Sequence, residues 1–354
     1  MAIDASLLAR LVCPRHLSPL SEVESRLHCE EGHDYPVVHD VPILLDRGPH
    51  TLWVAEASLD QVRHSGLSPE RDLYYIDTLG ISDEEKEALR KQLSEPGSCI
   101  DPVVSFMVGA TNGIAYKQLI GNLKDYPIPM LRLPPANGEV LLDVGCNWGR
   151  WCIAAARLGY TTIGIDPSLG AVLAAKRVMR QMGLDANFVV GDARFLPFRT
   201  ESLDVVYSYS VIQHFSKGNA IAAVKEIGRV LRSNGRSIVQ MPTTLGLRCL
   251  YHQTHRRFRE ARGFEVRYWW VPTLRRLFTG YVGRTTFSVD CFFGIGLQAA
   301  DVHFMARRHR FIIRTSEVLR KASKAFRGLC YVADSVYVES TKANTAISRT
   351  LILK

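Results

Sequence analysis

The sequence predicts an α/β protein built on a doubly wound, mostly parallel sheet. Between residues 139 and 241, apolar stretches of strand length alternate with longer stretches of helical periodicity. A glycine-rich turn, "DVGCNWGRW" (143–151), directly follows the first of these strands. The chain has 354 residues, 47% of them hydrophobic and 22% charged, which is the composition of a globular protein long enough for two or three domains.

Residues 1–46 are predicted to form a small N-terminal module. Two residues separate Cys13 from His16, and three separate Cys29 from His33. Two such pairs joined by a short spacer are typical of a zinc ribbon, in which a β-hairpin brings two tight turns together. Thiolate and imidazole suit tetrahedral zinc, so the four residues form a complete candidate ligand set. A metal-free ribbon with two unrelated histidines is the alternative.

Two known ribbons resemble this module. "CPRH" and "CEEGH" resemble the N-terminal ribbon of the 23S rRNA guanine methyltransferase family, and "YPVVHDVPILL" (35–45) is similar to the end of the small zinc-ribbon activators of tRNA and other methyltransferases. The departure is His16, where those families usually have cysteine. The resemblance implies a ribbon fold that holds a structural zinc ion.

Residues 47–137 are predicted to form a helical linker that folds over the next domain as a lid. "SDEEKEALRKQLSE" (82–95) has the composition of an exposed helix, with Ser82 as the N-cap and Glu85 three residues further on. The proline-rich stretch "YPIPMLRLPPANG" (126–138) then marks a domain boundary.

Residues 138–242 are predicted to form the doubly wound domain, whose ligand should bind at the carboxyl ends of the strands. Gly145 and Gly149 follow the first strand, and Asn147 between them tolerates the left-handed backbone of a tight turn. The expected strands are 139–145, 160–166, 186–193, 202–211 and 236–242, and the expected helices are 150–159, 168–183 and 219–235, the last ending in a turn at Asn234-Gly235.

The glycine turn differs from a dinucleotide-binding loop. No third glycine follows at residues 150–152, and Asp143 lies two residues before the first glycine. Asp166 ends the second strand, where a carboxylate can accept both hydroxyls of a ribose. Asp192, in "GDARFLPF", follows the third strand, where it can accept a hydrogen bond from an adenine amine. A nicotinamide cofactor is therefore the weaker alternative.

In this order and spacing, residues 139–241 resemble the class I S-adenosylmethionine-dependent methyltransferases of the small-molecule type, whose sheet is Rossmann-like. The resemblance implies that the turn at Gly145, Asn147 and Gly149 lets the backbone approach the methionine part of the cofactor. Asp143 would help to hold its amino group, and Asp166 would bind the ribose. The other implied cofactor contacts are Asp192 and Ala193 at the adenine, and Tyr209 and Ser210 near the methionine end.

His214 is the candidate catalytic residue. Methyl transfer from a sulfonium is an in-line displacement, which needs a base only when the acceptor must lose a proton. In "SYSVIQHFS" (208–216), His214 follows the fourth strand, and its ordinary pKa near 6.5 suits a base at neutral pH. A packing role for this histidine is the alternative.

Residues 243–354 are predicted to cap the substrate side and to complete the sheet. "WWVPTLRRLF" (269–278) predicts a helix that starts near Pro272, and "SVDCFFGIGLQAADVHF" (288–304) suits either a substrate pocket or a core segment. "RTSEVLRKASKAF" (314–326) is a basic amphipathic helix. Residues 242–354 contain 20 basic and 7 acidic side chains, whereas residues 1–138 contain 12 basic and 20 acidic ones. We therefore expect either that the basic C-terminal third binds an anionic partner or that its charge complements the acidic N-terminal third of the same chain.

Taken together, these features predict a cytoplasmic S-adenosylmethionine-dependent methyltransferase with a structural zinc ion. The chain contains no apolar run of about 18 residues, and its first residues lack the long apolar core of a signal peptide. The expected acceptor is a small, lipid-like or anionic metabolite that is methylated on oxygen or carbon. The alternatives are an RNA (rRNA or tRNA) base methyltransferase and a non-catalytic protein that binds the cofactor and regulates a partner. A peripheral contact with a membrane is compatible with the basic C-terminal third.

Overall fold

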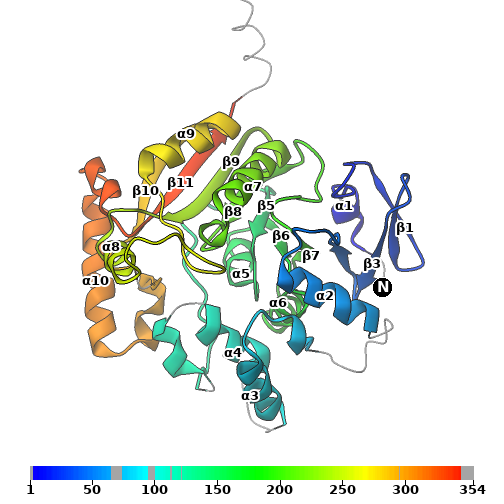
Figure 1. Cartoon of the computed structure of the whole chain (residues 1–354), viewed down its shortest axis with the longest axis horizontal. Coiled ribbons are helices and arrows are strands. Elements are labelled where there is room, and N and C mark those ends of the chain that lie inside the picture. Colours follow the sequence, from blue (N-terminus) through cyan, green and yellow to red (C-terminus); the bar gives the residue numbers. More distant parts are fainter. Residues whose placement is uncertain are drawn as a thin grey trace, which may run out of the picture. The chain divides into compact units, whose positions relative to one another are not determined.

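The computed structural model describes residues 3–64, 74–94, 100–111, 114–120, 122–294 and 296–343, apart from the side chains of residues 64, 110, 111 and 114. The chain divides into two compact units, residues 1–199 and residues 200–354. Figure 1 labels the elements of both units along the chain. The boundary between the units falls inside the stretch 138–242, and the four segments expected from the sequence stay a prediction.

The sheet of the first unit has the strand order β1-β2-β3-β4-β7-β6-β5. β1 to β4 pair in antiparallel fashion, and β4 then pairs in parallel with β7, so that Ile43 lies opposite Val190 and Leu44 opposite Gly191. The N-terminal module therefore shares its sheet with the strands that follow. These strands are β1 Leu20–Val23, β2 Arg26–Cys29, β3 Asp34–Val38, β4 Val41–Leu44, β5 Val140–Val144, β6 Thr161–Asp166 and β7 Asn187–Gly191.

The helices of the first unit include the predicted capped helix. In α3 the Ser82 hydroxyl accepts a hydrogen bond from the Glu85 amide at 3.2 Å, and the Glu85 carboxylate accepts one from the Ser82 amide at 2.9 Å, which confirms the capping box. The helices are α1 Ala5–Leu8, α2 Trp53–His64, α3 Asp83–Leu93, α4 Pro102–Thr111, α5 Arg150–Ala156 and α6 Leu169–Gln181, with 3₁₀ turns at Ile76–Thr78 (η1) and Ile114–Leu119 (η2).

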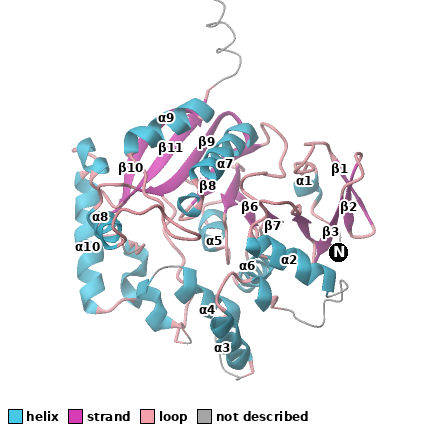
Figure 2. Ribbon diagram, in the orientation of Figure 1, coloured by secondary structure: helices cyan, strands magenta, loops and turns pink. Residues whose placement is uncertain are grey.

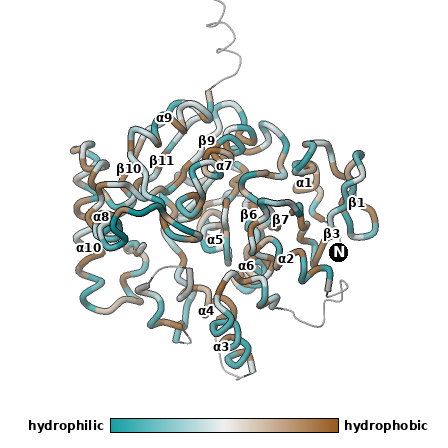
Figure 3. Tube along the Cα trace, in the orientation of Figure 1, coloured by the Kyte–Doolittle hydropathy of each residue, from teal (hydrophilic) through white to brown (hydrophobic). Residues whose placement is uncertain are grey.

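The parallel strands β5, β6 and β7 form the apolar centre of the first unit. All five residues of β5 are buried, and so are four of the five in β7. Strands buried on both faces read as continuous apolar runs, which is how β5 and β7 read in the sequence. Figure 2 shows β6 and β7 with the helices of the unit, and in Figure 3 the trace of these strands includes hydrophobic residues.

The sheet of the second unit has the strand order β8-β9-β11-β10. β8 and β9 are parallel, whereas β9, β11 and β10 are joined by antiparallel pairs. The elements are β8 Leu203–Ser208, η3 Ile212–His214, α7 Lys217–Val230, β9 Leu231–Pro242, α8 Leu247–His255, α9 Val271–Tyr281, β10 Gly283–Cys291, η4 Ala299–Phe304, α10 Arg307–Ala322, η5 Arg327–Tyr331 and β11 Ser335–Lys342.

The helix predicted at 219–235 ends earlier than expected. α7 stops at Val230, and the following residues already belong to β9. Leu231 pairs with Leu203 and Arg236 with Val205, so the residues between them form an irregularity in the strand, where Asn234 has φ 64°. The sequence predicted a turn at Asn234-Gly235 that ends the helix, but it did not show that a strand surrounds these residues.

The arrangement confirms the predicted Rossmann-like α/β fold. Parallel strands alternate with helices in both units, and α9 begins beside Pro272 as the sequence predicted. Among the residues that the structure describes, no helix is long and apolar enough to cross a membrane.

Candidate active site

The turn after β5 has the backbone that the sequence predicts. Gly145, Asn147 and Gly149 have φ values of 76°, 49° and 79°. A Cβ on Gly149 would lie 2.9 Å from the Cβ of Ala175, so only glycine fits there without a shift of α6. The amides of Gly145 and Cys146 both donate to the carbonyl of Ile165, at 2.8 and 3.0 Å, which fixes the turn against β6.

Asp166 lies at the carboxyl end of β6 and faces this turn. Its two carboxylate oxygens accept hydrogen bonds from the amides of Asn147, at 3.0 Å, and Ser168, at 2.9 Å. Burial raises the pKa of Asp166 to about 6, although both hydrogen bonds oppose the shift. Each oxygen keeps further lone pairs, so the carboxylate is fixed in place and can still accept bonds from a ligand.

Asp143, in β5, is more deeply buried than Asp166. The Cys152 thiol lies 3.5 Å from one carboxylate oxygen, and the other oxygen, Oδ1, has no hydrogen-bond partner among the described residues. Burial raises the pKa of Asp143 to about 7, and the nearby charge of Asp166 adds to the shift. A buried carboxylate oxygen without a partner is costly in a native protein and suggests a missing donor, as a ligand or a water would supply.

Asp192 follows β7, as predicted, but Arg194 already contacts its carboxylate. The Arg194 backbone amide donates to the Asp192 carboxylate at 2.8 Å, and the Arg194 Nε donates to it at 3.0 Å. The Nη2 of the same guanidinium donates to the carbonyl of His50 at 2.8 Å. Ala193, between the two, is 9% exposed. Arg194 therefore joins the predicted adenine contact to the segment that follows β4, a link that the sequence did not indicate.

A cavity of about 490 Å³ adjoins Asp192 and Arg194. Its apolar walls include Leu44, Leu45 and Pro49, all from the segment at the end of β4. His16, one of the predicted metal ligands, also lines this cavity. The predicted adenine contact and the N-terminal module thus border the same hollow in the first unit.

Two side chains from the segment 47–137 support the loop after β6. The buried Ser58 hydroxyl donates to the carbonyl of Pro167 at 2.8 Å and accepts from the amide of Leu169 at 3.0 Å. The buried Thr78 hydroxyl accepts from the amide of Gly170 at 2.6 Å. These bonds hold the first turn of α6 beside Asp166, so part of the segment 47–137 packs against the loop after β6.

In the second unit, Tyr209 and Ser210 follow β8. The Tyr209 hydroxyl donates to the carboxylate of Asp290 at 3.1 Å, and the same carboxylate oxygen accepts from the Ser335 hydroxyl at 2.7 Å. Ser210 has φ 63°, and its amide donates to the side chain of Gln240 at 3.0 Å. Asp290 and Gln240 come from β10 and β9, and the sequence pattern gave no sign of their role.

His214 has a partner on each ring nitrogen. Nδ1 lies 2.6 Å from the carbonyl of Phe264, which can only accept, so Nδ1 carries the proton. Nε2 lies 3.2 Å from the side-chain nitrogen of Gln213, which donates to it. Burial lowers the pKa of His214 despite the bond to Phe264, so the neutral form is favoured at neutral pH.

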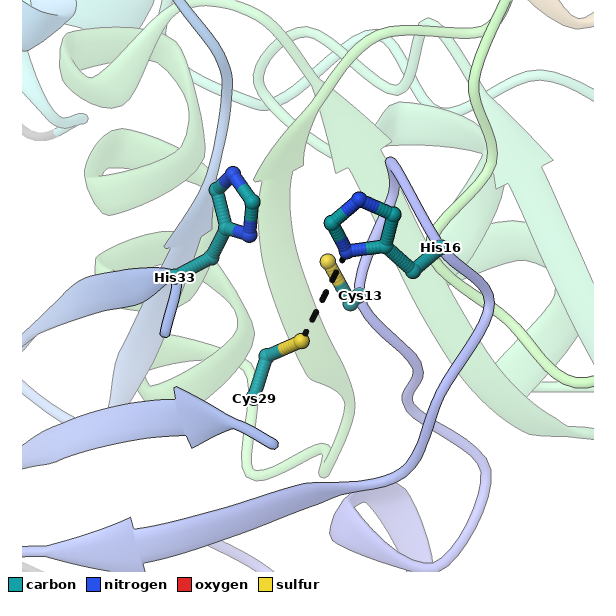
Figure 4. A group of neighbouring side chains, drawn as sticks. All are labelled: Cys13, His16, Cys29 and His33. Carbon is teal, nitrogen blue, oxygen red and sulfur yellow. Dashed lines mark hydrogen bonds between the residues drawn. The ribbon is translucent and has the colours of Figure 1, made fainter. Parts of the chain in front are cut away.

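The four predicted metal ligands converge in the N-terminal module. The ligand atoms of Cys13, His16, Cys29 and His33 all lie within 4.8 Å of one another, and Figure 4 shows both sulfurs directed toward the two imidazoles. Within the described part of the chain, the buried Nδ1 of His33 has no hydrogen-bond partner. Two thiols and two imidazoles at this separation have the chemistry of a tetrahedral zinc site.

The fold, the left-handed turn after β5 and the fixed Asp166 define a Rossmann-like domain of the methyltransferase type. Residues 141–235 match the family model described as "Methyltransferase domain". This segment is therefore similar to the class I S-adenosylmethionine-dependent methyltransferases, as the sequence predicted.

The similar proteins match part of the chain. A ubiquinone biosynthesis O-methyltransferase of Brucella anthropi is 33% identical over 118 residues, which are 30% of this chain and 48% of that protein. One from Azorhizobium caulinodans is 29% identical over 107 residues, 30% of this chain and 42% of that protein. The chain thus spans about half the length of these relatives. A solved SAM-dependent methyltransferase of Methanosarcina mazei is 18% identical, with a TM-score of 0.43, over 60% of this chain and 99% of that one.

Proposed function

We propose that the chain binds S-adenosylmethionine at the carboxyl ends of β5, β6 and β7 and transfers its methyl group to a small molecule. The observation that supports this most is the fixed carboxylate of Asp166. Two backbone amides orient its two oxygens beside the left-handed turn, and the remaining lone pairs suit the paired hydroxyls of a ribose. The partnerless oxygen of Asp143 suits the amino group of the methionine part.

The bound cofactor would supply a methyl group on a positively charged sulfur. We assign the cofactor contacts in the first unit to the turn Gly145–Gly149, Asp143 and Asp166, with Asp192 and Ala193 at the adenine. We propose that Tyr209 and Ser210, which belong to the second unit, contact the cofactor near its methionine end. Asp290 holds the Tyr209 hydroxyl in one orientation, so its oxygen can accept a hydrogen bond from an acceptor hydroxyl.

We propose that the acceptor is a small, lipid-like or anionic metabolite that is methylated on oxygen or carbon. The relatives named as ubiquinone biosynthesis O-methyltransferases support a small acceptor. RNA is the second candidate, because residues 242–354 contain 20 basic and 7 acidic side chains. We place the reaction in the cytoplasm, where thiols such as those of the N-terminal module stay reduced.

The test is transfer of a labelled methyl group from S-adenosylmethionine to total RNA and, in parallel, to a metabolite extract. Label in a low-mass product supports the proposal. Label in RNA at a comparable rate would refute the small acceptor but not the methyltransferase. Tight binding of S-adenosylhomocysteine with no labelled product in either sample would favour the non-catalytic, regulatory alternative. RNA binding through many phosphates should also weaken steeply with salt.

We further propose that Cys13, His16, Cys29 and His33 hold one structural zinc ion. The convergence of their ligand atoms and the partnerless Nδ1 of His33 support it. The measurement is elemental analysis after purification in metal-free buffer. We expect about one zinc per chain, lost in Cys29→Ser and kept in the matched control Cys330→Ser, which lies outside the cluster. Less than about a tenth of an equivalent in the unaltered protein would exclude the site.

A further inference from the structure

The solvent-facing side of α10 has a composition that is unusual for a surface helix. Arg307, Phe311, Arg314, Val318 and Lys321 are spaced four, three, four and three residues apart, so they lie on one side of the helix, and all five are exposed. We call these five residues the α10 stripe. Phe311 is 72% exposed and Val318 66%, so two large apolar side chains alternate with three cations along about 21 Å of helix.

The orientation of α10 is fixed by its opposite side. Ile313 is 1% exposed, and the buried Ser316 hydroxyl accepts a hydrogen bond from the amide of Phe292, just after β10, at 3.0 Å. The helix therefore cannot rotate to bury Phe311 and Val318 without losing these contacts. α10 is at the left of Figure 1, and in Figure 3 it carries both hydrophilic and hydrophobic residues.

The exposed apolar surface continues beyond the helix. Phe326 is 70% exposed, Val332 46% and Tyr331 38%, and the ring of Tyr331 lies 6.2 Å from that of the exposed Trp270. Single exposed apolar side chains are ordinary, but a series of them within one segment indicates an interaction surface.

The charges of α10 select the partner. The helix has six arginine and lysine residues and one acid, Glu317, which is paired with Arg320 at 2.7 Å. In the described part of the chain, the three cations of the α10 stripe form no ion pair. Two copies that met through this stripe would place like charges together, so a second copy is disfavoured. The phosphates of RNA could pair with the three cations, but Val318 has no aromatic ring on which a base can stack, so RNA is the less suitable partner.

We propose that the α10 stripe docks the protein on the surface of an anionic lipid bilayer. Phe311 and Val318 would enter the boundary between headgroups and acyl chains, while Arg307, Arg314 and Lys321 would lie among the anionic headgroups. The proposal does not depend on the methyl transfer proposed above, because no residue of the stripe belongs to the candidate active site.

The test is co-sedimentation of the full-length protein with vesicles of phosphatidylcholine alone or mixed equally with phosphatidylglycerol. We expect at least tenfold tighter binding to the mixed vesicles, weakened by 0.5 M salt. The double variant F311S/V318S should bind the mixed vesicles at least tenfold more weakly. The matched control is V23S/M130S, which removes two exposed apolar side chains of the first unit, 52% and 57% exposed, and should bind like the unaltered protein.

The charge-reversal variant R314E/K321E changes only exposed side chains and gives an independent result. We expect it to lose the preference for anionic vesicles while its unfolding temperature and its affinity for S-adenosylhomocysteine stay unchanged. Equal binding of the unaltered protein to both vesicles would overturn the proposal, as would stripe variants that bind like the unaltered protein. Binding to total tRNA but not to mixed vesicles would also overturn it and would identify a nucleic-acid surface.

Discussion

Replacing Asp166 with alanine should weaken binding of S-adenosylhomocysteine by roughly 100-fold. Each charge-assisted hydrogen bond to a buried carboxylate contributes about 1.5–3 kcal/mol, and a ribose would make two. Water can enter the vacated space and satisfy the amides of Asn147 and Ser168, so we take about 3 kcal/mol as the net loss. About 1.4 kcal/mol corresponds to a factor of ten in the dissociation constant, which gives the expected change.

The same substitution should not lower the stability of the free protein at pH 8. Burial raises the pKa of Asp166 from its ordinary value of 3.8 to about 6, so the ionised carboxylate is costly in the folded state above that pH. Alanine removes this cost, of order 3 kcal/mol, and this gain offsets the loss of the two hydrogen bonds that the backbone amides donate to the carboxylate. Weaker binding together with an unchanged or higher unfolding temperature would exclude misfolding as the cause.

Isothermal titration calorimetry with S-adenosylhomocysteine measures the affinity directly. The control is Asp185→Ala, which removes an exposed acid of the same unit, just before β7, and should bind like the unaltered protein. A dissociation constant for Asp166→Ala within threefold of the unaltered value would refute the ribose site. Affinity should also fall as the pH drops below about 6, because the protonated carboxyl loses acceptor strength.

Three further substitutions test the remaining residues. Asp143→Asn should raise the unfolding temperature at pH 8 but not near pH 4, because the pKa of Asp143 is raised to about 7 in the folded protein. The unaltered protein therefore loses up to roughly 4 kcal/mol of stability as the pH rises from about 4 to 7. A gain in unfolding temperature that is equal at both pH values would contradict this. His214→Ala should lower the unfolding temperature and slow methyl transfer less than tenfold, since both ring nitrogens already have hydrogen-bond partners. A fall in the transfer rate of about 100-fold or more would instead establish His214 as a general base. Asp290→Asn should slow transfer by about tenfold and also weaken binding of S-adenosylhomocysteine, because it misorients the Tyr209 hydroxyl. Unchanged turnover together with unchanged affinity would remove Tyr209 from the cofactor contacts.

The features that the sequence predicted well are set by neighbouring residues. The left-handed turn depends on Gly145, Asn147 and Gly149, the α3 cap on Ser82 and Glu85, and the candidate metal cluster on two short spacings. In each case a local backbone preference or a fixed spacing determines the geometry. The alternation of strands and helices was equally readable, because it follows from apolar periodicity.

The features that the sequence did not predict depend on contacts between distant residues. Ser58 bonds to Pro167 across 109 residues, and Tyr209 bonds to Asp290 across 81. No periodicity connects such pairs, and serine and aspartate are common surface residues, so neither stood out. The early end of α7 has a similar cause, because pairing of Leu231 with Leu203 overrides a local helical preference.

The parallel pairing of β4 with β7 means that the N-terminal module is not an independent appendage. Without β4, the side of β7 that now pairs with Ile43 and Leu44 would present unpaired amides and carbonyls beside a strand of buried valines. An unprotected, apolar strand edge is a template for aggregation. A chain shortened to begin after residue 46 would therefore tend to associate through β7 rather than fold as a smaller enzyme, so the module is also a solubility element for the domain it precedes.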